Sequence, residues 1–398
     1  MAITKGRSQV HIYFATRDWS DVWIGQQPIV NEITKSGEFV LYVDFFISIF
    51  GGIKVPKYRP KIIQWFKGKR CGLEKVNKNL FVFTPPLGFH IGSHWPFLFK
   101  INYRLLEKSI KKIMKYLGIK KPVIWFDNVF AGYLMGRLGE RISIYHVLDE
   151  PKEFPGANKQ NISNVERNII PMIDLLFVVS EQLLKSKKKL NPSTYLIRNG
   201  VDIGRFLEVQ EDNNINKLFE GMKRPILGFV GAIASWVDLD LLRYVAEKFP
   251  NSNLVLVGIE VYGNPAEVNA LRNMKNVLFF GKKEQSEIPH YIKNFDICMI
   301  PFKKNKLTEN ADPRKLYEYL AAGKIVVATD ISSYFRELNQ YIYLARDKHE
   351  FVEAIRKALC ENFQDKIDKR IQFARSCSWQ NRWYTMRDII SNYISTKN

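Results

Sequence analysis

The most constraining feature of this chain is the alternation, along its whole length, of short apolar runs with longer amphipathic stretches. Continuous runs of β-branched and aromatic residues are typical of strands that are covered on both faces. The runs that predict strands are residues 10–14, 39–43, 80–83, 123–126, 142–147 and 175–179 in the first half, and 226–230, 254–257, 277–280, 297–300 and 325–328 in the second. Because strands that alternate with helices form mainly parallel sheets, the pattern predicts an α/β protein.

The length of the chain favours two domains, since 398 residues exceed what one hydrophobic core usually organises. Residues 209–223 are polar and lack clear periodicity, which is typical of a linker. We therefore predict an N-terminal domain over residues 1–208 and a second domain over residues 224–378, followed by a C-terminal segment over residues 379–398.

The formal net charge of +20 is the unusual bulk property of the sequence. It indicates an anionic partner, which is a nucleic acid, an acidic membrane surface or a phosphorylated substrate, although a compositional bias toward Lys, Ile and Asn also contributes. The four cysteines are scattered without metal-binding or disulfide spacing, which favours a reducing cytoplasm. Lys5, Arg7 and His11 interrupt any apolar signal region, and no apolar run is long enough to span a bilayer.

The most informative segment covers residues 310–323. Asp312 is a good N-cap and Pro313 suits the first helical position, so a helix is predicted to begin here and to end at Gly323. Arg314, Lys315 and Glu318 share one flank of that helix. Two cations in the first turn of a helix oppose the helix dipole, which is unfavourable. An anion that binds at this end of the helix would offset that cost. The alternative is an ordinary surface helix with an Arg314–Glu318 ion pair.

A second phosphate-binding element is the strand at residues 226–230, which runs directly into Gly231. In a doubly wound sheet the carboxyl ends of the strands line the ligand site, and a glycine there lets the backbone approach a phosphate. This pattern alone is weak, because many unrelated α/β enzymes share it.

Taken together, these segments resemble the GT-B glycosyltransferases, especially the family 4 and family 1-like enzymes of bacterial surface-polysaccharide assembly. The resemblance covers nearly the whole chain in order, with the segments 145–150, 178–184, 197–202, 228–233, 312–327 and 378–394. It implies two Rossmann-like domains that face each other across a cleft, with the C-terminal helix crossing back to the N-terminal domain. It also implies that the donor is a nucleotide-diphosphate sugar and that no metal or other cofactor is needed.

By this resemblance Arg314 and Lys315 hold the donor phosphates near Gly231, Glu318 binds the ribose, and residues 281–287 cover the nucleobase. Asn310 stands where many family members carry a second glutamate, so retention or inversion of stereochemistry stays open.

The N-terminal domain is expected to bind the acceptor. The loop after the first predicted strand contains Arg17, Asp18, Trp19 and Trp23, which offer charged groups and aromatic rings for a sugar. The two tryptophans have a structural alternative, which is packing beneath the next helix. Asp149, at the end of another strand, is the predicted general base. Its neighbour Glu150 and the more distant Asp127 are alternative candidates for the base. A structural interpretation is that Asp149 only forms an acidic turn before Pro151.

Two basic segments of the N-terminal domain predict contact with anionic lipid. Residues 100–117 form an amphipathic helix with Arg104, Lys108, Lys111 and Lys115 opposite its apolar stripe, and residues 55–71 interleave cations with aromatic residues. A solvated surface is the alternative for both. We therefore expect a cytoplasmic enzyme, peripherally bound to the inner face of the cell membrane, that uses a lipid-linked glycan acceptor. A GT-B epimerase and a basic nucleic-acid-binding protein are the rival functions, and the resemblance argues against nucleic acid as a partner.

Overall fold

The computed structural model describes residues 9–21, 25–45, 63, 72–86, 96–209, 213–261, 265–361 and 364–397. The chain divides into two compact units, Met1–Arg198 with Arg382–Asn398, and Asn199–Asn381. The predicted boundary lies later, at the segment 209–223. Within that segment a short helix forms, and Ile215 and Phe219 are buried in the hydrophobic core of the second unit. The segment therefore belongs to the second unit, because its apolar side chains have a core to enter.

The first unit is built on an eight-stranded sheet in the order β3-β4-β2-β1-β5-β6-β7-β8, in which only β3 runs antiparallel. Its strands are β1 Val10–Phe14, β2 Phe39–Val43, β3 Gly72–Lys75, β4 Leu80–Thr84, β5 Val123–Phe126, β6 Ile142–Val147, β7 Leu175–Val178 and β8 Thr194–Leu196. Its helices are α1 Gln26–Lys35, α4 Pro96–Leu117, α5 Lys159–Ile169 and α6 Glu181–Lys187, with the 3-10 turns η2 Val129–Leu134, η3 Pro151–Glu153 and η4 Ile170–Met172.

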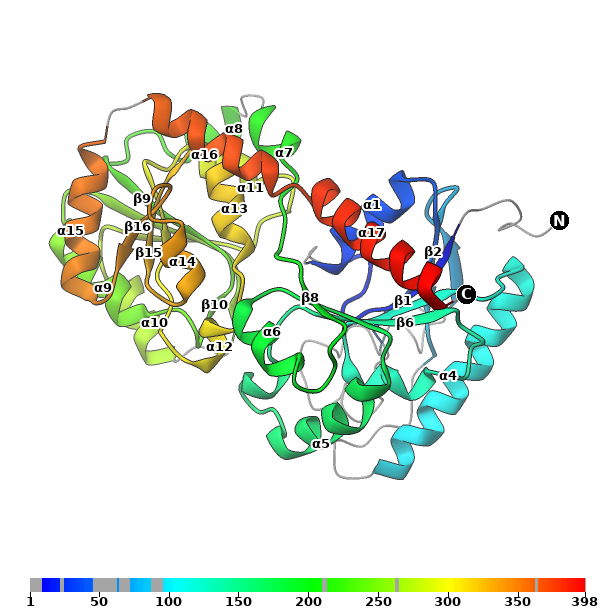
Figure 1. Ribbon diagram of the computed structural model, residues 1–398. Coiled ribbons are helices and arrows are strands. Elements are labelled where there is room, and N and C mark those ends of the chain that lie inside the picture. The colour runs from blue at the N-terminus through cyan, green and yellow to red at the C-terminus, as the bar shows by residue number, and fades with distance from the viewer. Residues whose placement is uncertain are drawn as a thin grey trace. The chain divides into compact units, whose positions relative to one another are not determined.

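Helices cover both faces of this first sheet (Figure 1). On one face, Leu106 and Ile110 of α4 and Ile169 of α5 pack against apolar strand residues such as Ile12 and Phe126. The opposite face meets α1 and the C-terminal helix α17, Trp379–Lys397. Both faces are therefore buried, which explains why the strands read as continuous apolar runs rather than as alternating ones.

The C-terminal helix begins in the second unit, and from Arg382 onward it belongs to the first. Trp383 packs against His11 and Trp125 on the first sheet, and its indole nitrogen donates to Ser36 Oγ at 3.2 Å. Near the end of the helix, Tyr393 donates to Asp174 at 3.0 Å. The predicted return of this helix to the N-terminal domain is therefore seen in the structure.

The second unit contains a six-stranded, wholly parallel sheet in the order β13-β11-β9-β14-β15-β16 and a small β10-β12 pair. Its strands are β9 Ile226–Val230, β10 Ile233–Ala234, β11 Asn253–Val257, β12 Glu260–Val261, β13 Val277–Gly281, β14 Ile297–Ile300, β15 Ile325–Thr329 and β16 Tyr343–Ala345. Its helices are α7 Gly204–Leu207, α8 Asn213–Lys217, α9 Leu239–Lys248, α10 Pro265–Arg272, α11 Ile288–Lys293, α12 Lys306–Glu309, α13 Arg314–Ala321, α14 Ser333–Glu337, α15 Lys348–Leu359 and α16 Gln364–Ser376.

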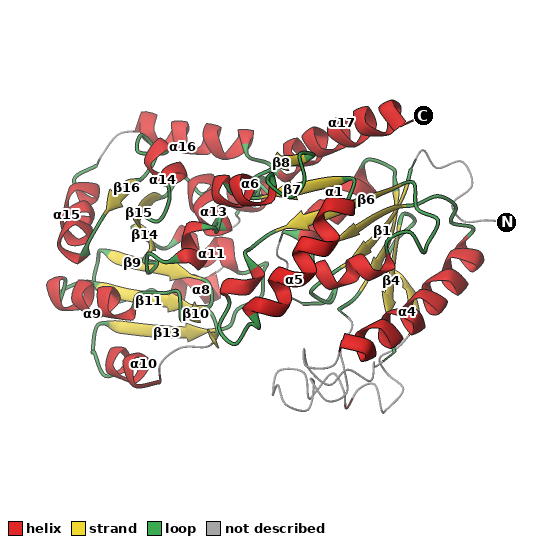
Figure 2. Ribbon diagram, turned by 60° about the horizontal axis from the view of Figure 1, so that its bottom comes forward, coloured by secondary structure: helices red, strands yellow, loops and turns green. Residues whose placement is uncertain are grey.

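The order of the second sheet places β9 at its centre, between β11 and β14, and helices lie on both of its faces (Figure 2). This is a doubly wound sheet, in which ligands bind at the carboxyl ends of the strands where the strand order reverses. The strand β9 ends at Val230 and runs directly into Gly231, so the predicted donor loop lies at this point.

Candidate active site

Three glycine turns meet at the carboxyl ends of β9, β11 and β13 in the second unit. The N–H of Gly231 donates to the carbonyl of Val257 at 2.9 Å, and that of Gly258 donates to the carbonyl of Gly281 at 2.9 Å. A Cβ atom at Gly258 would lie 1.9 Å from the Gly231 carbonyl oxygen, so these two backbones touch. Gly231 and Gly258 also have φ of 145° and 154°, which L side chains rarely adopt. The contact therefore requires glycine at both positions.

The Lys315 side chain lies over this edge of the sheet. Its ammonium nitrogen would be 3.2 Å from a Cβ atom at Gly231, and it sits 4.6 Å from the ring centre of Phe302 and 5.3 Å from that of Phe229. Burial lowers the pKa of Lys315 to about 8, with Arg314 adding to this effect and Glu318 opposing it. No ion pair joins Lys315 to a carboxylate within the part of the chain that the structure describes. A half-buried cation beside a glycine turn is suited to an anionic ligand.

The start of α13 differs from the sequence-based expectation. Pro313, with extended backbone, is the N-cap residue, and α13 begins at Arg314. The prediction that Asp312 caps the helix is wrong, because its carboxylate accepts hydrogen bonds from elsewhere. These come from the N–H of Asn199 at 2.6 Å and from the hydroxyl of Tyr317 at 2.8 Å. Asp312 thus joins the first residue of the second unit to α13.

Arg314 and Glu318 form the ion pair that the sequence offered as an alternative, with Nη2 and Oε1 3.0 Å apart. Both side chains are largely covered, and the apolar flank of the helix is buried through Leu316 and Leu320. Two further residues of this site were not identified from the sequence. They are Tyr319, whose hydroxyl accepts a hydrogen bond from the N–H of Val230 at 2.8 Å, and Asn199.

In the first unit, polar residues gather at the carboxyl ends of the adjacent strands β1, β5 and β6. Asp127 follows β5, is buried, and accepts a hydrogen bond from Thr16 Oγ1 at 3.3 Å. Burial raises the pKa of Asp127 to about 8 against the hydrogen bond from Thr16. Burial also raises the pKa of Asp149, just beyond β6, to about 7, and Arg17 lowers the pKa of both carboxyls. Carboxyls that titrate near neutrality are suited to proton transfer.

Glu150, the neighbouring alternative for the base, has a different environment. It is buried and pairs with Lys187 at 3.2 Å, and Lys187 in turn pairs with Glu166 at 2.5 Å. This buried network joins the end of β6 to α5 and α6. Of the two adjacent acids, Asp149 is therefore the one without such an ion pair among the described residues.

The loop after β1 is only partly described, because Trp23 lies outside the described residues. Trp19 packs edge-on against Tyr42 with ring centres 5.1 Å apart, and the backbone N–H of Trp19 donates to the Asp44 carboxylate at 2.8 Å. Asp18 is buried, and its carbonyl accepts from Gln27 at 3.2 Å. Arg17 is half-buried at the carboxyl edge of the sheet. These contacts fix the Trp19 ring and the backbone at Asp18 and Trp19, while the Arg17 charge acts on both titrating carboxyls.

The predicted amphipathic helix is α4, and its faces lie as expected. Leu106, Ile110 and Leu117 are buried. The cations on the outer face are exposed, namely Arg104, Lys108, Lys111, Lys112 and Lys115. Ile101, Leu105 and Tyr116 are exposed beside them, at 43%, 41% and 73% of their surface. Apart from Ile63, the second basic segment, residues 55–71, lies outside the described residues. No helix among the described residues has the length and apolar character to cross a membrane.

Comparison with known proteins agrees with this geometry. Residues 210–376 match the family model described as glycosyl transferases group 1. TuaH of Bacillus subtilis, assigned as a teichuronic acid biosynthesis glycosyltransferase, is 28% identical over 226 residues, which span 55% of this chain and 57% of that protein. The chain thus aligns with little more than half the length of this curated relative.

Solved structures give the fold over nearly the whole chain. Anabaena HepE, solved with UDP and glucose, has a TM-score of 0.67 at 15% identity and covers 96% of this chain and 99% of its own. WaaG, a glycosyltransferase involved in lipopolysaccharide biosynthesis, has a TM-score of 0.61 at 14% identity and covers 95% and 99%. The predicted fold is confirmed: the chain has the GT-B fold of glycosyltransferases, and residues 210–376 of its second unit are similar to the glycosyl transferases group 1 family.

Proposed function

We propose that this protein transfers a sugar from a nucleotide-diphosphate sugar to a hydroxyl group of a glycan acceptor, in polysaccharide or glycoconjugate assembly. The observation that carries the proposal is the position of the Lys315 ammonium, half-buried against the Gly231 turn at the carboxyl edge of the second sheet. The family match of this unit and the teichuronic acid relative support the same reaction, and they do not favour an epimerase.

In the donor site, Lys315 neutralises the diphosphate as its bond to the sugar breaks. Charge that develops on a leaving group is stabilised best by a cation that is already in place and partly desolvated. Arg314, which is paired with Glu318, adds a second positive charge on the same flank of α13. Glu318 is the residue we assign to the ribose hydroxyls. UDP is the first nucleotide to test, because HepE was solved with it.

In the acceptor site, Asp149 takes the proton of the attacking hydroxyl as that oxygen bonds to the anomeric carbon of the sugar. With a pKa of about 7, this carboxyl is substantially ionised at neutral pH and is also a stronger base than an ordinary aspartate. Arg17 favours the ionised form of the Asp149 carboxyl, and we assign it to an anionic or hydroxylated part of the acceptor. Trp19 and Trp23 remain candidates for contact with a sugar ring.

We also propose that the acceptor is lipid-linked and that the enzyme binds the inner face of the membrane through the outer face of α4. That face combines exposed cations with exposed apolar side chains, of which Leu105 and Tyr116 are examples. Apolar groups among cations suit an interface between water and anionic lipid, whereas exposed apolar side chains contribute nothing favourable to a face that only meets water.

The donor assignment is tested by calorimetric titration with UDP, GDP and TDP, followed by Lys315→Ala and Glu318→Ala. Removing a charge-assisted hydrogen bond costs about 1.5–3 kcal/mol, so Kd should rise about 10- to 150-fold in Lys315→Ala. Glu247→Ala is the matched control, because Arg243 and Glu247 form an exposed pair of the same spacing on α9, at 2.9 Å. Unchanged affinity in both site variants would refute the donor assignment.

A further inference from the structure

A pocket lies at the opposite edge of the second sheet from the glycine turns. Pro225, Asp296 and Lys324 line it, and each stands just before a strand, namely β9, β14 and β15. The end of α15 and the first turns of α16 complete the wall. The volume of the pocket is about 790 Å³. This size is within the range of about 300–1,000 Å³ that small-molecule sites occupy. Because it lies at the amino ends of the strands, the pocket is separate from the donor site.

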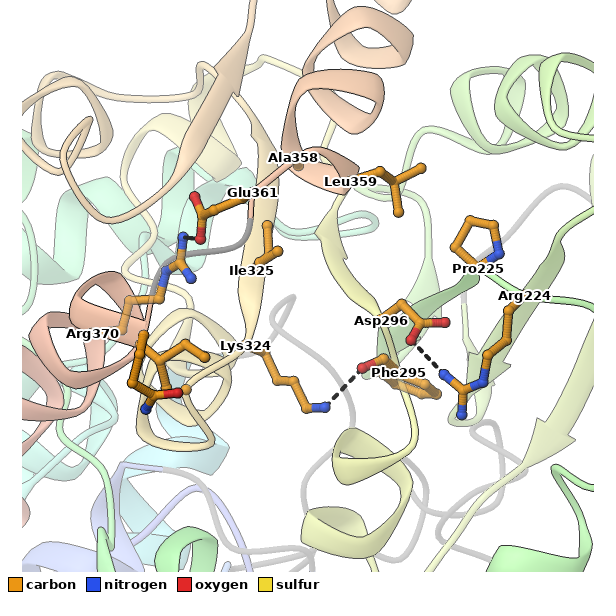
Figure 3. Close-up of a pocket in the computed structure, with 13 residues that line it drawn as sticks. Arg224, Pro225, Phe295, Asp296, Lys324, Ile325, Ala358, Leu359, Glu361 and Arg370 are labelled. Atoms are coloured by element: carbon orange, nitrogen blue, oxygen red, sulfur yellow. Dashed lines mark hydrogen bonds and ion pairs between the residues drawn. The ribbon is translucent and has the colours of Figure 1, made fainter.

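The charges that line this pocket do not balance. Arg224 pairs with Asp296 on one side, and Arg370 pairs with Glu361 at 2.6 Å on the other. Lys324 is the third cation, and within the described residues it forms no ion pair with a carboxylate. Its ammonium instead donates to the backbone carbonyls of Lys293 and Phe295, at 2.7 and 2.8 Å. In Figure 3 the Lys324 side chain runs between the two ion pairs. The lining therefore carries one positive charge in excess.

Arg370 supplies an unused hydrogen-bond donor in the same wall. The residue is only 2% exposed, and its Nε donates to the carbonyl of Tyr341 at 3.0 Å. Its Nη1 has no hydrogen-bond partner among the described residues. A buried donor without a partner destabilises the folded protein. An anionic oxygen in the pocket would offset both this cost and that of the partly buried Lys324 charge.

Apart from Gln364, the remaining lining side chains are apolar and include Pro225, Ile325, Leu359 and Ile367. Leu359 is 39% exposed, so an apolar side chain is available at the entrance. We propose that this pocket binds a small organic anion whose carboxylate or phosphate lies at Lys324 and Arg370 and whose apolar part covers Leu359 and Ile367. This ligand is distinct from the sugar donor, and its site does not depend on the proposed transferase activity.

The test is calorimetric titration of the full chain at low salt with phenyl phosphate, with benzoate, and with benzyl alcohol as the uncharged analogue. The two anions should bind and the alcohol should not, and the tighter of the two anions identifies the head group. Lys324→Gln keeps N–H donors for the two carbonyls and removes the charge, so it should weaken binding at least 10-fold. Leu359→Trp fills the entrance and should do the same. Thermal unfolding of each variant verifies that it is folded.

Two control variants decide where the probe binds. Lys357→Gln removes an exposed charge of α15 outside the pocket and should leave the affinity unchanged. Lys315→Ala removes the donor-site cation and should also leave it unchanged. Absence of binding by both anions to the unmodified chain would overturn the proposal. So would an affinity equal to that of the unmodified chain in Lys324→Gln and in Leu359→Trp. Loss of binding in Lys315→Ala would also overturn it, because it would place the probe in the donor site.

Discussion

The Cε and Nζ atoms of Lys315 lie 3.1 and 3.2 Å from the position that a Cβ atom would occupy at Gly231. The lysine thus fills the space that only glycine leaves open. Gly231→Ala should displace the ammonium and strain a backbone at φ 145°, so nucleotide-diphosphate affinity should fall at least 10-fold. Gly221→Ala is the control, because Gly221 also has positive φ, 73°, but faces open space. Equal affinities of the two variants by calorimetry would contradict this role of Gly231.

The depressed pKa of Lys315 predicts how donor binding depends on pH. Since burial lowers this pKa to about 8, the free protein loses the ammonium charge as pH rises through that value. Kd for a nucleotide diphosphate should be constant from pH 6.5 to about 7.5 and should rise above pH 8, by up to about tenfold per pH unit. Lys315→Met should bind weakly at every pH without this rise. Calorimetry between pH 6.5 and 9.5 measures both, and a flat curve for the unmodified protein would exclude Lys315 as the charge that holds the phosphates.

Much of the fold could be predicted, because the strands that form the two sheets are buried on both faces. Each of the eleven predicted strands is found, most with the same bounds, from Val10–Phe14 to Ile325–Thr329. The missed strands lie at sheet edges or in the small pair, as with Gly72–Lys75, whose residues are mostly exposed. An edge strand lacks a continuous apolar run because one or both of its faces meet solvent.

Residues of the candidate site could be predicted where their local position is unfavourable without a ligand. They could not be predicted where they depend on contacts between residues far apart in the sequence. Arg314 and Lys315 could be identified from the sequence, because two cations in the first turn of a helix are unfavourable unless an anion binds there. The hydrogen bonds from Asn199 to Asp312 join residues far apart in sequence, so no local pattern indicates them. Likewise, Asp149 and Glu150 are adjacent acids, and only the fold places Lys187 beside the second.

The two adjacent acids should separate in mutants. Asp149→Asn removes the carboxylate that we assign as the base, so turnover should fall about 10²- to 10⁴-fold with little change in donor affinity. In the unmodified enzyme, turnover should rise as pH increases through about 7, because the Asp149 carboxyl ionises there. Glu150→Gln should lower the melting temperature by weakening the buried Lys187 network, yet keep the turnover of the folded protein. If Asp149→Asn kept a turnover close to that of the unmodified enzyme, the general base would have to be Asp127, or the reaction would need no carboxylate base.

Ionisation of the buried Asp127 carboxyl should lower the free energy of unfolding at high pH. Its pKa is about 8 in the folded protein and near 3.8 in the unfolded chain, so the folded state holds a proton that the unfolded state has released. The contribution of this group to stability is complete below about pH 4 and is lost as pH rises through 8. Asp127→Asn lacks this loss, so the variant should melt at a higher temperature than the unmodified protein at pH 9, and the difference should shrink toward pH 5. Melting curves by circular dichroism across this range would contradict the prediction if the two proteins shifted in parallel.

The outer face of α4 should govern attachment to anionic membranes. Exposed charges are screened over about 8 Å at physiological ionic strength, so co-sedimentation with acidic liposomes should weaken as salt rises and should be absent with neutral ones. Replacing Lys108, Lys111 and Lys115 with Gln should reduce binding without loss of folding, since these side chains are exposed. Of the three, Lys111 is paired with Glu107 at 2.7 Å, so Lys108 and Lys115 should account for most of the effect.

Two comparisons separate a specific surface from the general positive charge of the chain. A triple change of Lys217, Lys275 and Lys357 to Gln removes the same charge from exposed positions of the second unit and should leave liposome binding intact. Leu105→Ser with Tyr116→Ser should reduce the part of binding that survives high salt, because that part depends on apolar burial. If both triple variants lost binding equally, the attraction would belong to the +20 charge as a whole rather than to α4. The acceptor could then be a soluble glycan, and the donor site would keep its assignment, because its residues lie in the second unit.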